Sequence, residues 1–186
     1  MVNVNEKDVI LPHQKYFKNF KTNFNSVEDL FISKLKKQKN KKFIFFPEEN
    51  LEFTYNEFFN SYIKISNILI KKGFKKKDKI SIIFFNESAF LKIYFAALSL
   101  GMIVIPINPD LSYDEINYIV KNSSSKTCIY SEKIGFKIKK NNKKYFSYSS
   151  FFNEEKNKTF INQKNIKPSI KITDEAIIIY TSGTTG

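Results

Sequence analysis

Residues 79–106 alternate between apolar runs and a helical stretch in a pattern that few folds accommodate. The run 79–85 is apolar and β-branched, residues 89–100 have a helical composition, and a second apolar run covers 102–106 after Gly101. Short runs of this kind are typical of strands that are buried on both faces. A strand, a helix that ends at glycine and a second strand form a right-handed crossover with parallel strands. We therefore predict an α/β fold with a largely parallel sheet flanked by helices.

The alternation continues toward the end of the chain. Residues 112–115 read Ser-Tyr-Asp-Glu, a capping box that predicts the start of an amphipathic helix. The apolar runs 126–130 and 176–180 predict two further strands, which we expect in the same sheet as the first two. Between them, residues 135–171 are rich in Lys, Asn and Ser and predict surface loops around a short strand near 145–146.

The first part of the chain predicts a helix, a hairpin and a second helix. Ser26 is expected to cap the first helix, and residues 43–53 read as strand, turn and strand. We expect this hairpin at an edge of the sheet. Thr54 and Glu57 have the spacing of a capping box at the start of the next helix. Residues 1–25 contain no usable pattern.

Small hydroxylated residues and glycines follow the last predicted strand. The chain ends Tyr-Thr-Ser-Gly-Thr-Thr-Gly over residues 180–186. Gly183 and Gly186 permit positive φ and close backbone approach, and hydroxyl donors to phosphate oxygens are available from Thr181, Ser182, Thr184 and Thr185. The spacing is not that of a Walker A loop, because no Lys follows Gly186. A phosphate-binding loop after a strand is our interpretation, and a flexible Ser/Gly-rich tail is the alternative.

This string resembles the phosphate loop of the acyl-adenylate-forming, or AMP-binding, superfamily, which includes acyl-CoA synthetases, luciferases and peptide-synthetase adenylation domains. In that superfamily the loop continues with x-Pro-Lys-Gly. Residues 51–58 look like its first core motif, Leu-Thr-Tyr-x-Glu-Leu, and residues 96–109 look like its second. Asn108 favours the acyl-CoA synthetases, since peptide-synthetase domains usually carry Asp there. Lys77 departs from the glycine that is common in relatives.

The resemblance implies the N-terminal part of the large domain of such an enzyme, with residues 1–25 as an unpatterned segment and 26–186 as the start of the AMP-binding domain. It implies a parent ligase that uses ATP, Mg2+ and CoA to turn a carboxylic acid into an acyl-AMP and then an acyl-CoA. Contacts to the ATP phosphates are implied for Thr181, Ser182, Gly183, Thr184, Thr185 and Gly186. The catalytic residues and metal ligands of the family are expected beyond residue 186, so we expect no activity from this chain alone.

Three alternatives stay open. The first is part of a peptide-synthetase adenylation domain, which passes the acyl group to a carrier-protein thiol. The second is a nucleotide-binding module without chemistry, and the third is a structural α/β domain whose last loop is a linker.

Composition and charge limit the class of protein to which the chain can belong. A chain of 186 residues with 42% hydrophobic residues is globular rather than disordered. The net charge of +13 comes from lysine without arginine, which disfavours nucleic-acid recognition but permits weak peripheral attraction to anionic membranes.

No apolar run approaches the length of a membrane span and no signal segment is evident, so we expect a cytoplasmic protein. Cys128 is expected to be a buried thiol in a reducing compartment, and His13 a surface side chain.

Overall fold

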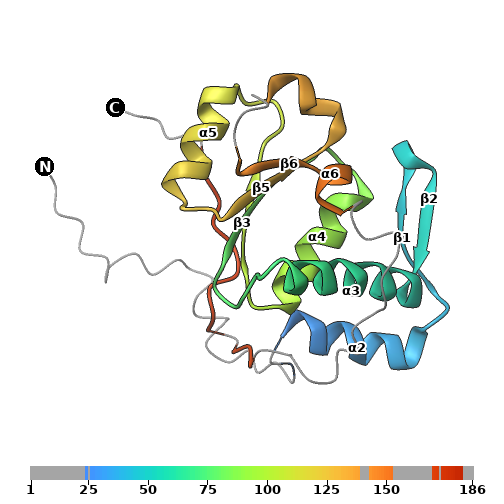
Figure 1. Cartoon of the computed structure of the whole chain (residues 1–186). Helices are drawn as coiled ribbons and strands as arrows, with labels where there is room; N and C mark the ends of the chain where they lie inside the picture. Colours follow the sequence, from blue (N-terminus) through green and yellow to red (C-terminus); the bar gives the residue numbers. More distant parts are fainter. Residues whose placement is uncertain (1–23, 25, 139–142, 153–168, 172, 182–186) are drawn as a thin grey trace, which may run out of the picture.

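The computed structural model describes Phe24 and residues 26–138, 143–152, 169–171 and 173–181 (Figure 1). Its α-helices are α2 (Val27–Gln38), α3 (Tyr55–Lys71), α4 (Ser88–Ser99), α5 (Tyr113–Asn122) and α6 (Tyr148–Phe152). Its strands are β1 (Lys42–Phe46), β2 (Leu51–Thr54), β3 (Lys79–Ile83), β4 (Ile103–Ile107), β5 (Thr127–Tyr130) and β6 (Tyr145–Ser147). Short 3-10 turns cover Pro47–Glu49 and Glu132–Lys137. None of the helices in this part of the chain is long and apolar enough to cross a membrane.

The main sheet is parallel throughout and has the strand order β4-β3-β5-β6. This confirms the predicted α/β fold and the parallel pairing of the strands near 79–85, 102–106 and 126–130. The short strand expected among surface loops is β6, which joins the sheet beside β5. Residues 176–180 run parallel to β4 but form a single bridge, between Val104 and Ile177, rather than a full strand.

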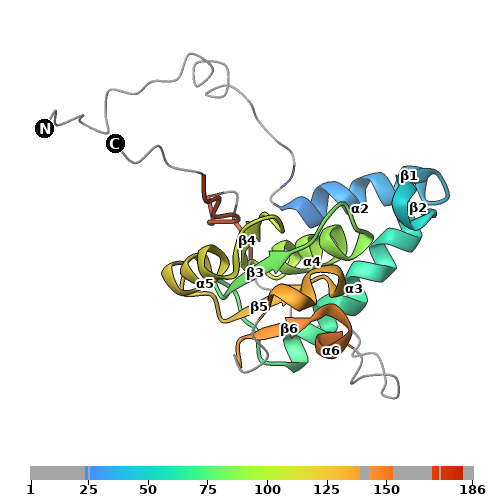
Figure 2. The same cartoon turned by 90° about the horizontal axis from the view of Figure 1, so that it is seen from above.

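Helices cover both faces of this sheet. Alternate side chains along β3 point to opposite sides, so that Ile82 belongs to a core shared with α2, α3 and α4, and Ile83 to a core shared with α5. Figure 2 shows α5 on one side of the strands and α3 and α4 on the other. Cys128 lies fully buried in the α5 core as a free thiol, as expected, and its burial raises the pKa of the thiol.

The hairpin of β1 and β2 does not lie at an edge of the main sheet, and that prediction was wrong. The two strands form a separate antiparallel sheet that packs against α3. Aromatic contacts account for this position, since the Phe43 ring lies 5.1 Å from that of Phe31 in α2 and 5.0 Å from that of Phe58 in α3. Pairs of rings at such distances contribute beyond the area that they bury. The position of the hairpin is therefore set by its packing against α2 and α3, and not by pairing with an edge strand of the main sheet.

Three helices begin as the sequence predicts. The Ser26 hydroxyl accepts a hydrogen bond from the backbone N–H of Asp29, at 3.1 Å. Complete capping boxes join Thr54 to Glu57 at the start of α3 and Ser112 to Glu115 at the start of α5.

The start of α4 is capped from a distance. Glu87 occupies the N-cap position without capping the helix, and its carboxylate instead accepts from the Ser131 hydroxyl at 2.7 Å. The Ser88 backbone N–H donates to both carboxylate oxygens of Glu49, at 3.1 Å each. Because Glu49 belongs to the turn between β1 and β2, this contact ties the separate hairpin to the carboxyl end of β3.

The turn before β3 holds Lys77 in the left-handed region, at φ 70°. Its backbone N–H donates to the Gly101 carbonyl at 2.8 Å, which links the turn to the loop before β4. A side chain in this conformation costs about 1–2 kcal/mol, whereas glycine adopts it freely.

We predict that Lys77→Gly stabilises the chain by about 0.5–1 kcal/mol, because the relief of strain exceeds the added entropy of the unfolded state. Urea unfolding followed by circular dichroism measures the change. Lys75→Gly, in the same turn but without positive φ, is the matched control and should not stabilise. Equal effects of the two substitutions would show that backbone strain at residue 77 is not the cause.

We predict that Glu49→Ala lowers the free energy of unfolding by about 1–2 kcal/mol, because the Ser88 N–H at the start of α4 loses its acceptor. The neighbouring Glu48 is more exposed and lies 3.9 Å from the Lys133 ammonium. Its replacement by alanine should change stability by less than about 0.5 kcal/mol. A loss of the same size for both variants would contradict the distant cap.

Candidate functional site

The last described segment approaches the sheet beside β4 and runs toward its carboxyl edge. Two backbone hydrogen bonds hold it: the Val104 N–H donates to the Ala176 carbonyl at 2.9 Å, and the Ile178 N–H donates to the Val104 carbonyl at 3.0 Å. In Figure 1 the red segment follows the sheet and ends beside α5. Thr181, the first residue of the predicted phosphate loop, therefore lies where the parallel strands end, the edge at which open α/β sheets bind their ligands.

Side chains fix the orientation of this segment. Ile178 and Tyr180 pack against the α5 core, while Ile177 and Ile179 on the opposite side remain 40% and 68% exposed. The Tyr180 hydroxyl donates to the Asn122 amide oxygen of α5 at 2.6 Å. Thr181 is thus delivered to the edge by a strand-like segment that is anchored on one face only.

A cavity of about 550 Å³ opens between this segment, the end of β4 and α5. Its size is in the range of small-molecule sites. The residues that line it are Pro106, Ile107, Asn108, Leu111, Asp114, Glu115, Tyr118, Ile119, Tyr180 and Thr181.

The charged residues that line this cavity, Asp114 and Glu115, are both acidic. The hydroxyl and backbone N–H of Ser112 donate to the Glu115 carboxylate, and these hydrogen bonds lower its pKa. A polyphosphate at this edge would therefore need a cation to offset the carboxylates, and Mg2+ with its preference for oxygen ligands fits that need. Within the described ranges, no group of three or more His, Cys, Asp or Glu side chains is arranged to hold a metal ion.

Asn108 forms a turn directly after β4. Its amide oxygen accepts from the Asp110 N–H at 2.9 Å, an Asx turn that an aspartate would form equally well. The observed role of Asn108 therefore does not separate acyl-CoA synthetases from peptide-synthetase domains.

Of the six predicted phosphate-binding residues, the structure describes Thr181, which is exposed beside the cavity. Ser182, Gly183, Thr184, Thr185 and Gly186 lie outside the described residues, as does His13. The sequence did not single out Asp114 or Tyr118, which line the cavity, or Asn122, which holds Tyr180 from the last residue of α5. The capping box at 112–115 was the sequence signal that could have pointed to Asp114. It predicts that α5 starts soon after β4, and therefore at the carboxyl edge of the sheet.

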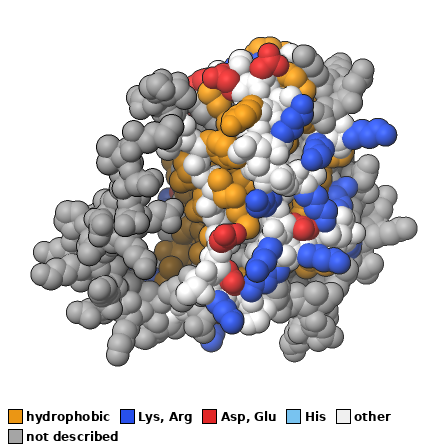
Figure 3. Space-filling model, turned by 90° about the vertical axis from the view of Figure 1, so that its left-hand side faces the viewer, with side chains coloured by type: hydrophobic (Ala, Val, Ile, Leu, Met, Phe, Trp, Pro, Cys, Tyr) orange, Lys and Arg blue, Asp and Glu red, His pale blue; other side chains and the backbone are white. Residues whose placement is uncertain are grey.

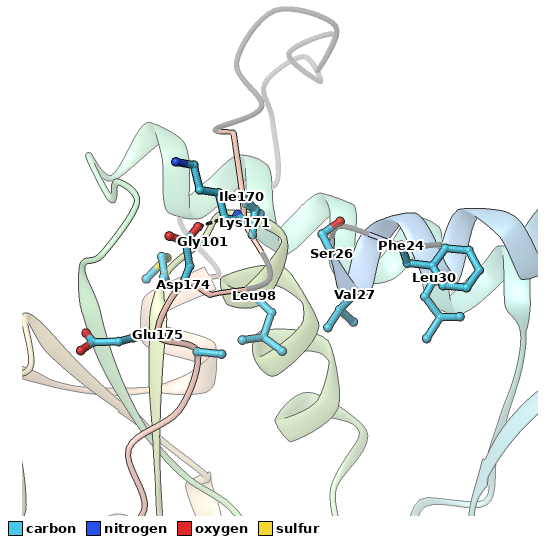
Figure 4. A pocket seen from close by; sticks show the side chains of 12 residues that line it. Phe24, Ser26, Val27, Leu30, Leu98, Gly101, Ile170, Lys171, Asp174 and Glu175 are labelled. Atoms are coloured by element: carbon cyan, nitrogen blue, oxygen red, sulfur yellow. Dashed lines mark hydrogen bonds between the residues drawn. The ribbon is translucent and has the colours of Figure 1, made fainter. Parts of the chain in front are cut away.

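A second cavity of about 270 Å³ lies at the opposite end of β4 (Figure 4). Apolar side chains from α2 and α4 dominate its lining, among them Val27, Leu30 and Leu98. The Asp174 carboxylate at its rim is already paired with the Lys76 ammonium at 2.7 Å. Among the described residues of its lining, Lys171 is the one cation and stands beside the carboxylates of Asp174 and Glu175, so this cavity offers little to a phosphate group.

Comparison with known proteins identifies the relatives of the chain. The family model described as AMP-binding enzyme matches residues 31–186. The 2-succinylbenzoate–CoA ligase of Oceanobacillus iheyensis is 30% identical over 139 residues, which cover 75% of this chain and 28% of the ligase. Tyrocidine synthase 3 of Brevibacillus parabrevis is 26% identical over 160 residues, covering 86% of this chain and 2% of the synthase. The chain thus spans less than a third of the length of these relatives.

The fold is shared with solved structures. The inhibitor-bound N-terminal domain of FACL13 from Mycobacterium tuberculosis superposes with a TM-score of 0.74 at 20% identity, covering 88% of this chain and 42% of that domain. At this identity the likeness shows the arrangement of helices and strands.

We predict a coupling of about 0.5–1.5 kcal/mol between Tyr180 and Asn122, since each supplies one half of the hydrogen bond that anchors the segment before Thr181. The measurement is a double-mutant cycle of Tyr180→Phe and Asn122→Ala in urea unfolding. Tyr94→Phe, in α4 on the opposite side of the sheet, replaces Tyr180→Phe in a control cycle and should give coupling near zero. Additive effects of Tyr180→Phe and Asn122→Ala would show that this hydrogen bond does not hold the segment.

Proposed function

Because the chain belongs to the AMP-binding enzyme family, whose model matches residues 31–186, we propose that it is the N-terminal part of an ATP-dependent carboxylic acid–CoA ligase. The observation that carries the proposal is the delivery of Thr181 to the carboxyl edge of the parallel sheet, beside a cavity of about 550 Å³. Similarity to 2-succinylbenzoate–CoA ligase supports the CoA-forming reaction.

The proposed reaction has two steps. A carboxylate oxygen attacks the α-phosphorus of ATP and forms a new phosphorus–oxygen bond. The bond from the α-phosphorus to the oxygen that bridges it to the β-phosphate breaks, pyrophosphate departs, and acyl-AMP is formed. A CoA thiol, after loss of its proton, then attacks the acyl carbon, and AMP leaves with the electrons of the acyl–oxygen bond. Mg2+ bound with ATP would offset phosphate charge next to Asp114 and Glu115.

The role of this chain is to hold phosphate oxygens in position. We assign hydroxyl contacts to Ser182, Thr184 and Thr185, with Thr181, Gly183 and Gly186 shaping the backbone of the loop. Donors that are fixed before the reaction stabilise developing charge at low reorganisation cost, which is how such a loop accelerates pyrophosphate departure. The anchor at Tyr180 and the bonds to Val104 hold the start of that loop on the rigid sheet.

We further propose that residues 26–186 are the beginning of the AMP-binding domain and that residues 1–25 precede it. The chain alone is proposed to be inactive, because the relatives that carry out the reaction are more than three times as long as the part that it matches. A cytoplasmic location is part of the same proposal.

A second candidate is adenylation for transfer to a carrier-protein thiol. Similarity to tyrocidine synthase 3 over 86% of the chain favours it. The first step is the same, and the second differs only in the thiol that accepts the acyl group. A nucleotide-binding module without chemistry is the remaining alternative.

The test uses the longest protein that the gene encodes in frame with residues 1–186. We expect carboxylate-dependent exchange of labelled pyrophosphate into ATP, and transfer of 18O from the labelled acid to AMP. Release of ADP and phosphate would contradict adenylation. CoA or a phosphopantetheinylated carrier protein, supplied in parallel, identifies the acceptor thiol.

In the same protein, Thr184→Ala/Thr185→Ala should lower kcat/KM for ATP by about 10²-fold or more, the typical effect of losing a donor to developing charge. Thr173→Ala removes an exposed hydroxyl outside the loop and serves as the matched control, with an expected change below about twofold. If the double variant exchanges labelled pyrophosphate into ATP at an unchanged rate, the proposed contacts between these hydroxyls and the phosphates are wrong.

A further inference from the structure

The fold gathers lysines at the amino edge of the main sheet, opposite the candidate nucleotide site. This edge is made of residues 71–79, 121–126, 143–144, 169–171 and 173–175, which we call the lysine edge. Its segments carry eleven lysines against three carboxylates, a net charge of +8. The rest of the described chain carries ten lysines against eleven carboxylates, a net charge of −1.

Hydrogen bonds join these segments into one continuous surface. The Lys126 N–H donates to the Lys79 carbonyl at 2.8 Å, and the Lys144 ammonium donates to the Ser125 carbonyl at 3.4 Å. The Lys76 ammonium reaches the Ser169 carbonyl at 2.6 Å. Three loops and the segments at 169–171 and 173–175 therefore lie side by side, although up to about a hundred residues separate them in the sequence.

The carboxylates of the lysine edge offset little of its charge. Asp78 pairs with Lys126 and Asp174 with Lys76, both at 2.7 Å. Lys75, Lys77 and Lys121 are exposed, as is most of the edge. On the face that Figure 3 shows, basic side chains gather beside an apolar strip, with a few acidic side chains among them.

We propose that the lysine edge docks on the surface of an anionic lipid bilayer. Lysines held near such a surface contribute about 1 kcal/mol each, and a dense basic segment such as residues 71–79 is the usual form of this interaction. The strands of five residues separate the two edges of the sheet by roughly 15 Å. A bilayer at the lysine edge would thus leave the cavity beside Thr181 open to water.

A bilayer fits these side chains better than a nucleic acid does. The basic residues are all lysine, so the bidentate contacts that arginine makes to phosphate and guanine are absent from this edge. Within the lysine edge the one aromatic residue, Phe74, is buried at 8% exposure and offers no platform for a base. Diffuse charge on flexible side chains suits a fluid layer of headgroups. The proposal does not depend on the proposed ligase function.

The test is co-sedimentation of the 186-residue chain with phosphatidylcholine vesicles that contain about 30% phosphatidylserine or none. We expect binding to the anionic vesicles only, with a steep loss between about 0.05 and 0.5 M salt as the charges are screened. Binding of the same strength to neutral vesicles would overturn the proposal.

Variants locate the surface. Lys75→Gln/Lys77→Gln/Lys121→Gln/Lys143→Gln should weaken partitioning by about 600-fold, at roughly fivefold for each of the four lysines. The matched control removes the same charge from α2 and the turn after it, as Lys36→Gln/Lys37→Gln/Lys39→Gln/Lys41→Gln, with an expected change below about threefold. Replacement of Lys75, Lys77, Lys121 and Lys143 by arginine instead of glutamine should restore binding. Equal losses in the two glutamine variants would overturn the proposal.

Circular dichroism of each variant checks the fold, and the arginine variant keeps the test decisive if the glutamine variant unfolds. A short DNA duplex is the competing ligand. If the chain binds the duplex at about 0.15 M salt and anionic vesicles fail to compete, the edge is a nucleic-acid surface and the bilayer proposal is wrong.

Discussion

Burial of β3 and β4 on both faces is the constraint on which the rest of the structure depends. Ile80, Ile82 and Ile83 are fully buried in β3, and Val104 and Ile105 are fully buried in β4. Backbone groups at such positions have no access to water, so the strands must pair with each other and the faces must be covered by helices. The covering helices leave the two ends of the strands as the surfaces on which loops gather.

The carboxyl and amino edges of the main sheet differ in charge because different loops meet at each edge. At the carboxyl edge, the turn at Asn108, the first turn of α5 and the segment that ends at Thr181 surround a cavity whose charged lining is acidic. At the amino edge, the loops that return from the helices carry most of the excess lysine. A parallel sheet places all strand ends of one kind on one side, so each edge collects its own set of loops from distant parts of the sequence. The proposed nucleotide site and the proposed membrane surface are thus consequences of one topology.

Contacts between distant segments set the geometry of these edges. Glu49 caps α4 from the hairpin, Asn122 holds Tyr180, and the Gly101 carbonyl accepts from the strained turn at Lys77. Each of these bonds joins residues between 24 and 58 positions apart, and each satisfies a donor near an edge of the sheet. A hydrogen bond of this kind contributes about 0.5–1.5 kcal/mol, so together the contacts favour a single arrangement of the loops.

The sequence by itself determined the elements whose signals are local. Apolar runs predicted β3, β4 and β5, the capping boxes at Thr54 and Ser112 predicted the starts of α3 and α5, and ordered motifs indicated the AMP-binding family. Tertiary structure decided what depends on non-local contacts: the hairpin packs on α3 through Phe43, residues 176–180 meet β4 in one bridge, and β6 joins the sheet. It also decided that lysines from separate loops share one edge, since charge in a sequence has no position until the chain is folded.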